Sequence, residues 1–212
     1  MNIFVLALII GTGLISYKGF TNSFFFRKYE FHVGSIRAGE HVRMITSAFL
    51  HADIVHLFFN MWVLFMFGQN VIAVMGNVGF IIVYFGSLIF GSLLTMVFHK
   101  NDYNYRAVGA SGAVTGILYS AILLQPDMML GIFFIIPMPA YIFGILYLLY
   151  SIYGMKAKND NIGHTAHFGG AVGGYVITLI EQPQLLVDHT LMVVLLTIPI
   201  IVLFILQRLG KL

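Results

Sequence analysis

The sequence predicts an all-α integral membrane protein with seven transmembrane helices, and its composition and the spacing of its charges are the two observations that predict it. Hydrophobic residues make up 59% of the 212 positions and charged residues 9%, whereas soluble domains carry about 25% charge. The charges are clustered and leave long uncharged runs at 1–17, 54–99, 107–126, 128–155, 161–180 and 189–207. A helix needs roughly 20 apolar residues to cross a hydrocarbon core of about 30 Å. The run 54–99 therefore holds two spans, broken near Gly76 and Asn77, and every other run holds one.

The first run, 1–17, is expected to stay in the protein as a helix. A signal peptide would need a positively charged start and a small-residue cleavage site, and neither is evident in this run. The chain has no cysteine, which excludes disulfides and thiolate metal sites. Its formal charge of +3 lies in loops without a Lys/Arg block, so nucleic acid is not an expected partner. We expect one polytopic membrane domain over residues 1–212.

The long connection between the first two spans, residues 18–50, mixes aromatic and basic side chains at 24–29. Such a mixture suits an element in the membrane interface, where aromatic rings and cations meet lipid headgroups. A plain surface loop explains this stretch equally well, so both interpretations stay open.

The fourth span is unusually short. From Ser111 to Leu124 it has about 14 residues, or roughly 21 Å of helix. The chain must therefore enter the membrane as a non-helical segment, which is tolerated only where protein or a water-filled cavity surrounds it. Gly109 and Gly112 give the backbone freedom for that path. This costly arrangement predicts a functional site at the start of the helix.

Four polar side chains lie inside the predicted spans, where polar groups are costly and by default mark function. They are His56 and Asn60 in the second span, Ser111 in the fourth and His167 in the sixth. Because crossings alternate in direction, the second, fourth and sixth spans all start at the same membrane surface. At 1.5 Å per residue the four side chains lie within roughly 5–10 Å of that surface. Their matching depth predicts a single site.

These residue types suit acyl transfer. A serine hydroxyl becomes an effective nucleophile when a neighbouring imidazole takes its proton, so we predict Ser111 as nucleophile and His167 as general base. The tetrahedral intermediate needs hydrogen-bond donors, which His56, Asn60 and the N–H groups at the start of the fourth helix, including that of Gly112, would supply. No acidic residue falls within the spans near His167. The pair is therefore expected to be a dyad oriented by packing.

Each of these residues also has a plainer explanation. A serine in a small-residue span is commonly a packing residue. An intramembrane histidine acts in a proton relay or makes an interhelical hydrogen bond as often as it acts in catalysis. Gly163, Gly170 and Gly174 form first of all a close-packing surface, which would also bring the sixth helix near enough to the fourth for imidazole to reach hydroxyl. His164 and His167 lie three apart, but the chain has no HExxH motif and no carboxylate nearby, so no metal is expected.

Three segments resemble the rhomboid family of intramembrane serine proteases, in the family's order. They are residues 43–60 (RMITSAFLHADIVHLFFN), 109–112 (GASG) and 166–174 (AHFGGAVGG). The resemblance implies a rhomboid-like bundle of six core transmembrane helices over about 1–182. The run 189–207 would then be a seventh, C-terminal span that some members add.

The resemblance also implies roles for single residues. It makes Ser111 the nucleophile and His167 the general base, with His56 and Asn60 on the oxyanion side. Arg43 and His51 match positions that shape the long first loop and its contact with the membrane. No cofactor is implied. The substrates would be single-pass transmembrane proteins, cleaved in the lipid bilayer where their helix unwinds near small or helix-breaking residues.

The sequence departs from the family's pattern at two positions. Val42 stands before Arg43 where the family commonly has Trp, which weakens the anchor of the first loop. Thr115 stands four residues after Ser111, where many members carry an aromatic ring that stacks on the catalytic imidazole. Without that ring we expect His167 to be less tightly oriented and activity to be lower.

Two patterns disagree about the side on which the site opens. All 11 Lys and Arg lie on one side of the predicted spans, and the opposite loops hold only Asp127, Glu181 and Asp188. The positive-inside rule would put the basic side, with the mouth of the site, in the cytoplasm. The resemblance instead implies an extracytoplasmic opening, in the inner membrane of a bacterial cell.

Two functions from other classes stay open. A non-catalytic rhomboid-like protein that binds or retains membrane clients would share the fold, although inactive relatives typically lack the serine or the histidine and this chain has both. A small transporter or proton-conducting protein would use His56 and His167. That function predicts intramembrane carboxylates, and none falls within the spans.

Overall fold

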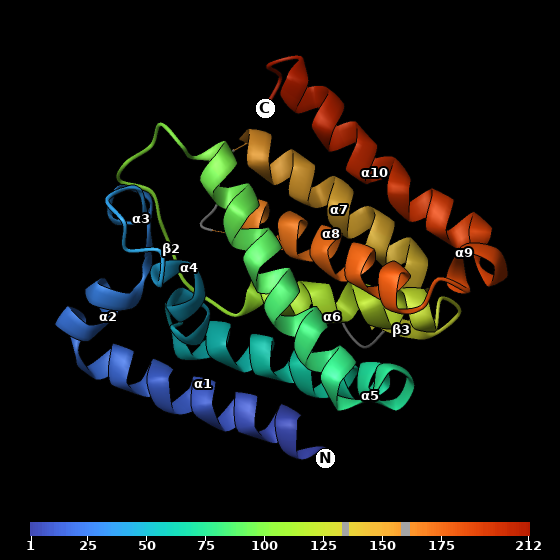
Figure 1. Cartoon of the computed structure of the whole chain (residues 1–212), viewed down its shortest axis with the longest axis horizontal. Coiled ribbons are helices and arrows are strands. Elements are labelled where there is room, and N and C mark those ends of the chain that lie inside the picture. The colour runs from blue at the N-terminus through green and yellow to red at the C-terminus, as the bar shows by residue number, and fades with distance from the viewer. Residues whose placement is uncertain (133–135, 158–161) are drawn as a thin grey trace.

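The structure is a computed structural model that describes residues 1–132, 136–157 and 162–212. Its helices are α1 (Ile3–Thr21), α2 (Ser23–Tyr29), α3 (Val33–Arg37), α4 (Arg43–Thr46), the 3₁₀ helix η1 (Ser47–Phe49), α5 (Ile54–Phe98), α6 (Ser111–Leu124), α7 (Ala140–Ala157), α8 (His164–Glu181), α9 (Leu185–Asp188) and α10 (Thr190–Arg208). Its strands are β1 (Phe31–His32), β2 (Arg106–Ala107), β3 (Met129–Ile132) and β4 (Ile136–Pro139). Figure 1 shows the long helices as one bundle.

The predicted all-α membrane bundle is confirmed. Among the described residues, α1, α5, α7 and α10 are long and apolar enough to cross a membrane, and α6 is a shorter apolar helix. α5 accounts for two of the predicted spans because Gly76 interrupts it with φ 69° and ψ −178°. The chain folds back near the middle of α5 in Figure 1. α8 corresponds to the sixth predicted span and has many buried small residues.

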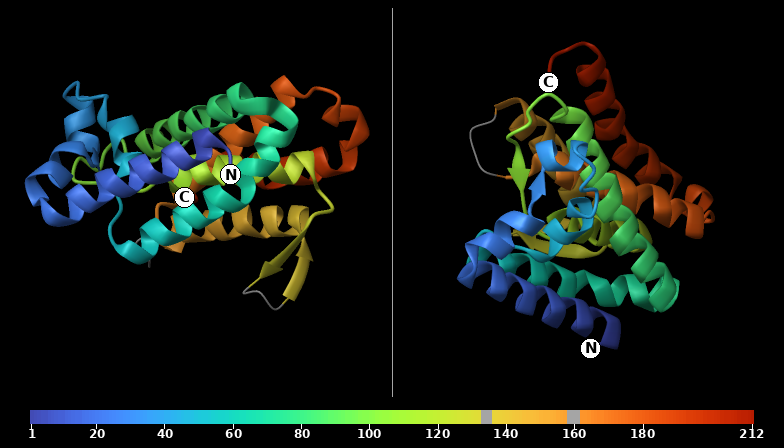
Figure 2. Two further views of the ribbon diagram at one scale, coloured as in Figure 1. Left: turned by 90° about the horizontal axis from the view of Figure 1, so that it is seen from below. Right: turned by 60° about the vertical axis from the view of Figure 1, so that its left-hand side comes forward.

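The run 128–155 holds the one predicted span as α7, which begins only at Ala140. The antiparallel strands Met129–Ile132 and Ile136–Pro139 precede it, which the sequence did not predict. Pro137 and Pro139 explain the difference, because proline lacks an N–H donor and biases the residue before it away from the helical region. Figure 2 shows these strands projecting away from the helices.

The connection between α1 and α5 is an ordered structure, and its aromatic and basic segment forms the helix α2, which excludes a plain loop. β1 in this connection pairs with β2, which lies just before α6. The buried Glu30 forms ion pairs with Arg106, in β2, and with Arg27. Arg43 is also buried and donates to the carbonyls of Arg27 at 2.7 Å and Glu30 at 3.1 Å. Arg43 therefore holds this connection together.

α6 packs against α8 backbone to backbone, and all of its residues from 112 to 123 are buried. Small residues line the contact, namely Gly112, Gly116 and Ser120 on α6 and Ala166, Gly170, Gly174 and Thr178 on α8. A Cβ atom added at Gly170 would lie 1.9 Å from the Gly112 carbonyl oxygen, and one at Gly174 would lie 2.1 Å from that of Gly116. This close approach depends on side chains without bulk, as in other membrane helix pairs.

Gly174→Ala is expected to lower the free energy of unfolding by roughly 1–3 kcal/mol, the usual range for overpacking a tight contact. The added methyl group must displace the backbone of α6 at Gly116. Gly13→Ala is the matched control, because a Cβ at this α1 position meets nothing within 4 Å. Thermal unfolding in detergent measures both variants. Equal unfolding midpoints would contradict the importance of this contact.

Candidate active site

Ser111 is the first residue of α6 and is half-buried. The segment before it is not helical, as its predicted path into the membrane requires. The Gly109 N–H donates to the Ser47 carbonyl at 3.0 Å, and the Ala110 N–H donates to His51 Nε2 at 3.3 Å. These bonds satisfy backbone groups that would otherwise be costly to bury. The start of α6 is thus held in place by the connection between α1 and α5.

Gly109 is required by both its backbone conformation and its neighbours. Its φ of +122° lies in the region that favours glycine, and a Cβ there would come within 2.8 Å of His56 Nε2. The imidazole of His56 therefore lies against the backbone two residues before Ser111. His56, in the first turn of α5, thus lies close to the segment that leads into α6.

His51 links three segments through one hydrogen-bond network. Its Nε2 accepts from the Ala110 N–H, so Nδ1 carries the proton and donates to Ser16 Oγ at 2.9 Å. Ser16 in turn donates to the Phe49 carbonyl at 2.9 Å. His51 is completely buried, and burial, assisted by the neighbouring His56, lowers the pKa of His51 to about 3. The network therefore requires a neutral imidazole.

His167 lies in the first turn of α8, where its N–H donates to the Gly163 carbonyl at 3.0 Å. The preceding residue, Ala166, packs against Gly112, since a Cβ at Gly112 would lie 3.2 Å from the Ala166 carbonyl oxygen. Ser111 and His167 therefore each lie next to a residue of the α6–α8 contact. Gly163, Ala166 and Ser111 also line one small cavity.

Tyr147 of α7 is a site residue that the sequence did not single out. Its hydroxyl lies 2.9 Å from His167 Nδ1 and 3.5 Å from Thr115 Oγ1. Thr115 is four residues after Ser111, so both project from the same face of α6. Tyr147 therefore shows that His167 lies on the Ser111 side of the α6–α8 contact. Tyr147 is one of 11 tyrosines in this chain, and no feature of the sequence distinguishes it from the others.

The dyad itself stays a prediction, and so does the looser orientation of His167 that Thr115 predicts. The structure adds a hydroxyl from α7, which lies 2.9 Å from His167 Nδ1. Thr115 contributes a hydroxyl beside that tyrosine instead of a ring of its own.

The predicted oxyanion donors differ in their present partners. Asn60 is buried one turn along α5 from His56, and its Nδ2 donates to the His56 carbonyl at 2.9 Å. One of its two amide hydrogens is therefore engaged within its own helix. At the start of α6 the first intrahelical bond runs from the Val114 N–H to the Ala110 carbonyl, and no side chain of the described residues caps the helix. The N–H groups of residues 111–113 thus precede the intrahelical pattern and carry the positive end of the helix dipole.

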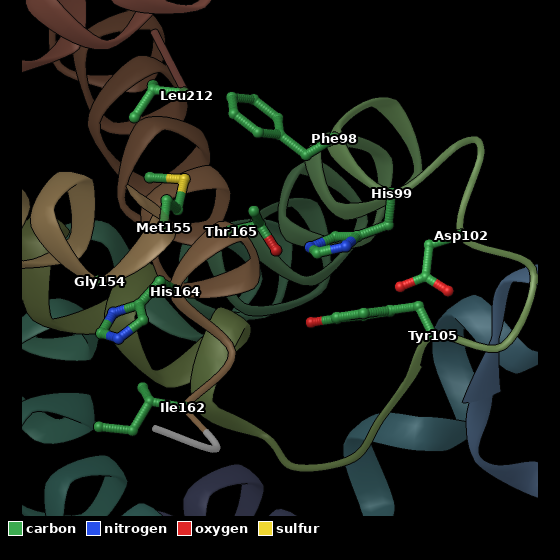
Figure 3. Close-up of a pocket in the computed structure, with 10 residues that line it drawn as sticks. All are labelled: Phe98, His99, Asp102, Tyr105, Gly154, Met155, Ile162, His164, Thr165 and Leu212. Carbon is green, nitrogen blue, oxygen red and sulfur yellow. The ribbon is translucent and has the colours of Figure 1, made fainter. Parts of the chain in front are cut away.

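Two cavities lie near these residues. The small one, of about 40 Å³, adjoins Ser111 and is lined in part by Ser47, Ser92 and Thr95. A larger one, of about 300 Å³, lies beside the first turn of α8 and is drawn in Figure 3. It is lined by Phe98, His99, Asp102, Tyr105, Gly154, Met155, Ile162, His164, Thr165 and Leu212. Within the described ranges, no three His, Cys, Asp or Glu side chains form a group that could hold a metal ion.

Comparisons with known proteins agree with the segments that the sequence singled out. The Rhomboid domain family model matches residues 38–184. The chain is 29% identical to RHOMBOID-like protein 12, mitochondrial, of Arabidopsis thaliana, over 79% of this chain and 55% of that protein. It is 33% identical to the putative rhomboid protease YdcA of Bacillus subtilis, over 67% of this chain and 68% of that protein. It is 31% identical to the rhomboid protease GluP of the same bacterium, over 66% of this chain and 26% of that protein.

The His51 network predicts a loss of stability in acid. The folded protein keeps His51 neutral down to a pKa of about 3, whereas an unfolded chain binds a proton below the ordinary value of 6.5. The free energy of unfolding should therefore fall as pH drops below 6.5, by roughly 2 kcal/mol between about pH 7 and pH 5. Unfolding of wild type and His51→Gln across this range measures the effect, and the variant should lack this contribution.

His41→Gln is the control for that experiment, because it removes an imidazole that is exposed to solvent. The free energy of unfolding of His41→Gln should depend on pH as that of wild type does. If His51→Gln also kept that dependence, His51 would not be the group responsible.

Proposed function

The chain belongs to the rhomboid family, and on that premise we propose that it is an intramembrane serine endopeptidase with Ser111 as nucleophile and His167 as general base. The observation that carries the proposal is the contact between the first turns of α6 and α8. Gly112 packs against Ala166, so Ser111 and His167 lie beside the same contact. The Tyr147 hydroxyl, between Thr115 and His167, supports their lying on the same side of it.

The proposed reaction divides peptide hydrolysis into two acyl-transfer steps. Ser111 Oγ attacks the scissile carbonyl while His167 Nε2 takes its proton, and His167 then protonates the leaving amine. Water next attacks the ester on Ser111, with His167 again as base.

The oxyanion of each tetrahedral intermediate is stabilised by donors at the start of α6 and on α5. The Gly112 N–H lies in the first turn of α6, where the helix dipole favours negative charge. His56 lies against Gly109, and Asn60 has a second amide hydrogen beyond the one bonded to His56. Each such donor contributes about 3–4 kcal/mol to transition-state stabilisation in acyl transfer.

The proposed substrates are single-pass transmembrane proteins, cut where their helix unwinds near small or helix-breaking residues. The aligned region spans 55% of the Arabidopsis relative and 26% of GluP, so the activity and substrates of those longer proteins support a proposal only. The two Bacillus relatives support a location in a bacterial cell membrane, whereas other relatives carry mitochondrial names. We further propose that residues 1–212 form one membrane domain, with α10 as the span added to the six-helix core.

Labelling with a fluorophosphonate probe tests the dyad. Purified wild type in detergent should become labelled, and Ser111→Ala and His167→Ala should not, because one removes the nucleophile and the other its base. Ser92→Ala is the control, since it removes a hydroxyl that also lines the small cavity but donates to the Met44 carbonyl. It should label like wild type. A folded wild type that stays unlabelled would sink the protease proposal in favour of a client-binding protein.

Asn60→Ala should reduce kcat by roughly 10²–10³-fold with little change in KM, because it removes a donor that acts chiefly in the transition state. Cleavage of a transmembrane reporter substrate measures both constants. Asn70→Ala, also on α5, is the control. It removes an amide that donates hydrogen bonds to Gln125 and Met128, and it should leave kcat unchanged. A rise in KM alone for Asn60→Ala would contradict the oxyanion role.

A further inference from the structure

We propose that Tyr147 is the positioning residue of the dyad, holding the His167 imidazole in the tautomer and orientation that a general base needs. This inference rests on the proposed function. Tyr147 comes from α7, a different helix from those that carry Ser111 and His167. Its hydroxyl lies 2.9 Å from His167 Nδ1, the ring nitrogen remote from the one that takes the serine proton.

The hydroxyl, not the ring face, makes this contact. The two ring planes are 19° from parallel, but their centroids lie 6.1 Å apart. Rings that overlap face to face at van der Waals separation would have much closer centroids, so the overlap here is small. A hydrogen bond to Nδ1 restrains the rotation of His167 about its side-chain torsions. A neighbour that only filled space would restrain that rotation less.

In this proposal Thr115 sets which way the proton points in the hydrogen bond between Tyr147 and His167. The Tyr147 O–H has two neighbours, His167 Nδ1 and Thr115 Oγ1, the latter at 3.5 Å. When Tyr147 donates to Thr115, its oxygen lone pairs face His167 and accept from Nδ1–H. The lone pair of the imidazole then lies on Nε2, the atom that must take the proton of Ser111. The opposite arrangement would place the proton on Nε2 and block the base.

The position of Tyr147 is built into the packing of α7. Tyr119, one turn after Thr115 on α6, donates its hydroxyl to the Gly144 carbonyl of α7. Phe143 packs beside the Tyr147 ring with planes 23° apart and centroids at 5.8 Å. The Tyr119 bond fixes the register of α7 against α6, and the Phe143 contact, within α7, packs against the Tyr147 ring. The pair Thr115 and Tyr147 therefore acts as one unit, in which a small hydroxyl on α6 makes room for the aromatic side chain from α7.

Tyr147→Phe tests this inference because it removes the hydroxyl and keeps the ring. The rate of fluorophosphonate labelling at saturating probe should fall about 10- to 100-fold, as expected for loss of a hydrogen bond to a group that becomes charged. The probe concentration for half-maximal rate should stay unchanged. Thr115→Val should lower the rate in the same direction, and Thr115→Ser, which keeps the hydroxyl, should restore it.

Tyr153→Phe is the matched control, because it removes the same atom from an exposed position on α7. Nitrogen-15 NMR of labelled histidine, with the His167 signal assigned through His167→Gln, reads the tautomer directly. Wild type and Tyr153→Phe should show the Nδ1–H tautomer at His167, and Tyr147→Phe should lose it. An unchanged tautomer in Tyr147→Phe, or an unchanged labelling rate with an active wild type, would overturn the inference.

The two proposals fail in different ways in this experiment. A wild type that shows the Nδ1–H tautomer but is never labelled would overturn the protease function and leave the Tyr147 contact supported. A wild type that is labelled, but whose His167 tautomer does not depend on Tyr147, would support the protease function and overturn the positioning role.

Discussion

The approach of α6 to α8 without intervening side chains is the constraint on which the rest of the structure depends. Gly112 and Gly116 on α6 meet Gly170 and Gly174 on α8 so closely that a single methyl group would overlap the opposite backbone. Apolar side chains gain little by leaving lipid for another helix, so such packing and the hydrogen bonds it permits hold membrane helices together. The same contact places the first turns of both helices side by side.

The short α6 can start inside the bundle because other segments satisfy the backbone before it. Ser47 accepts from Gly109, and His51 accepts from Ala110 while reaching Ser16 on α1. This network ties α1 and the long first connection to the position of Ser111. A buried neutral histidine thus has a structural part in the site. The resemblance pointed to His51 without giving this reason.

The resemblance implies that Thr115 stands where many family members carry an aromatic residue, and the surroundings of Thr115 in the fold bear on this difference. Judged from α6 alone, the change removes a ring from beside the imidazole. In the folded protein, Tyr147 of α7 places its hydroxyl between Thr115 and His167. The hydroxyl beside His167 therefore comes from a helix that lies about 30 residues further along the chain.

The sequence by itself determined the class of protein, the places of the membrane helices and the reversal at Gly76, because long uncharged runs and helix-breaking glycines act locally. It also singled out Ser111 and His167, since polar groups are rare in spans and alternating crossings put them at one surface. It did not determine the strands Met129–Ile132 and Ile136–Pro139, where Pro137 and Pro139 outweigh apolar composition. Only the tertiary structure decided the partners of His51 and His167. Their hydrogen bonds join residues brought together by helix packing, which no local pattern records.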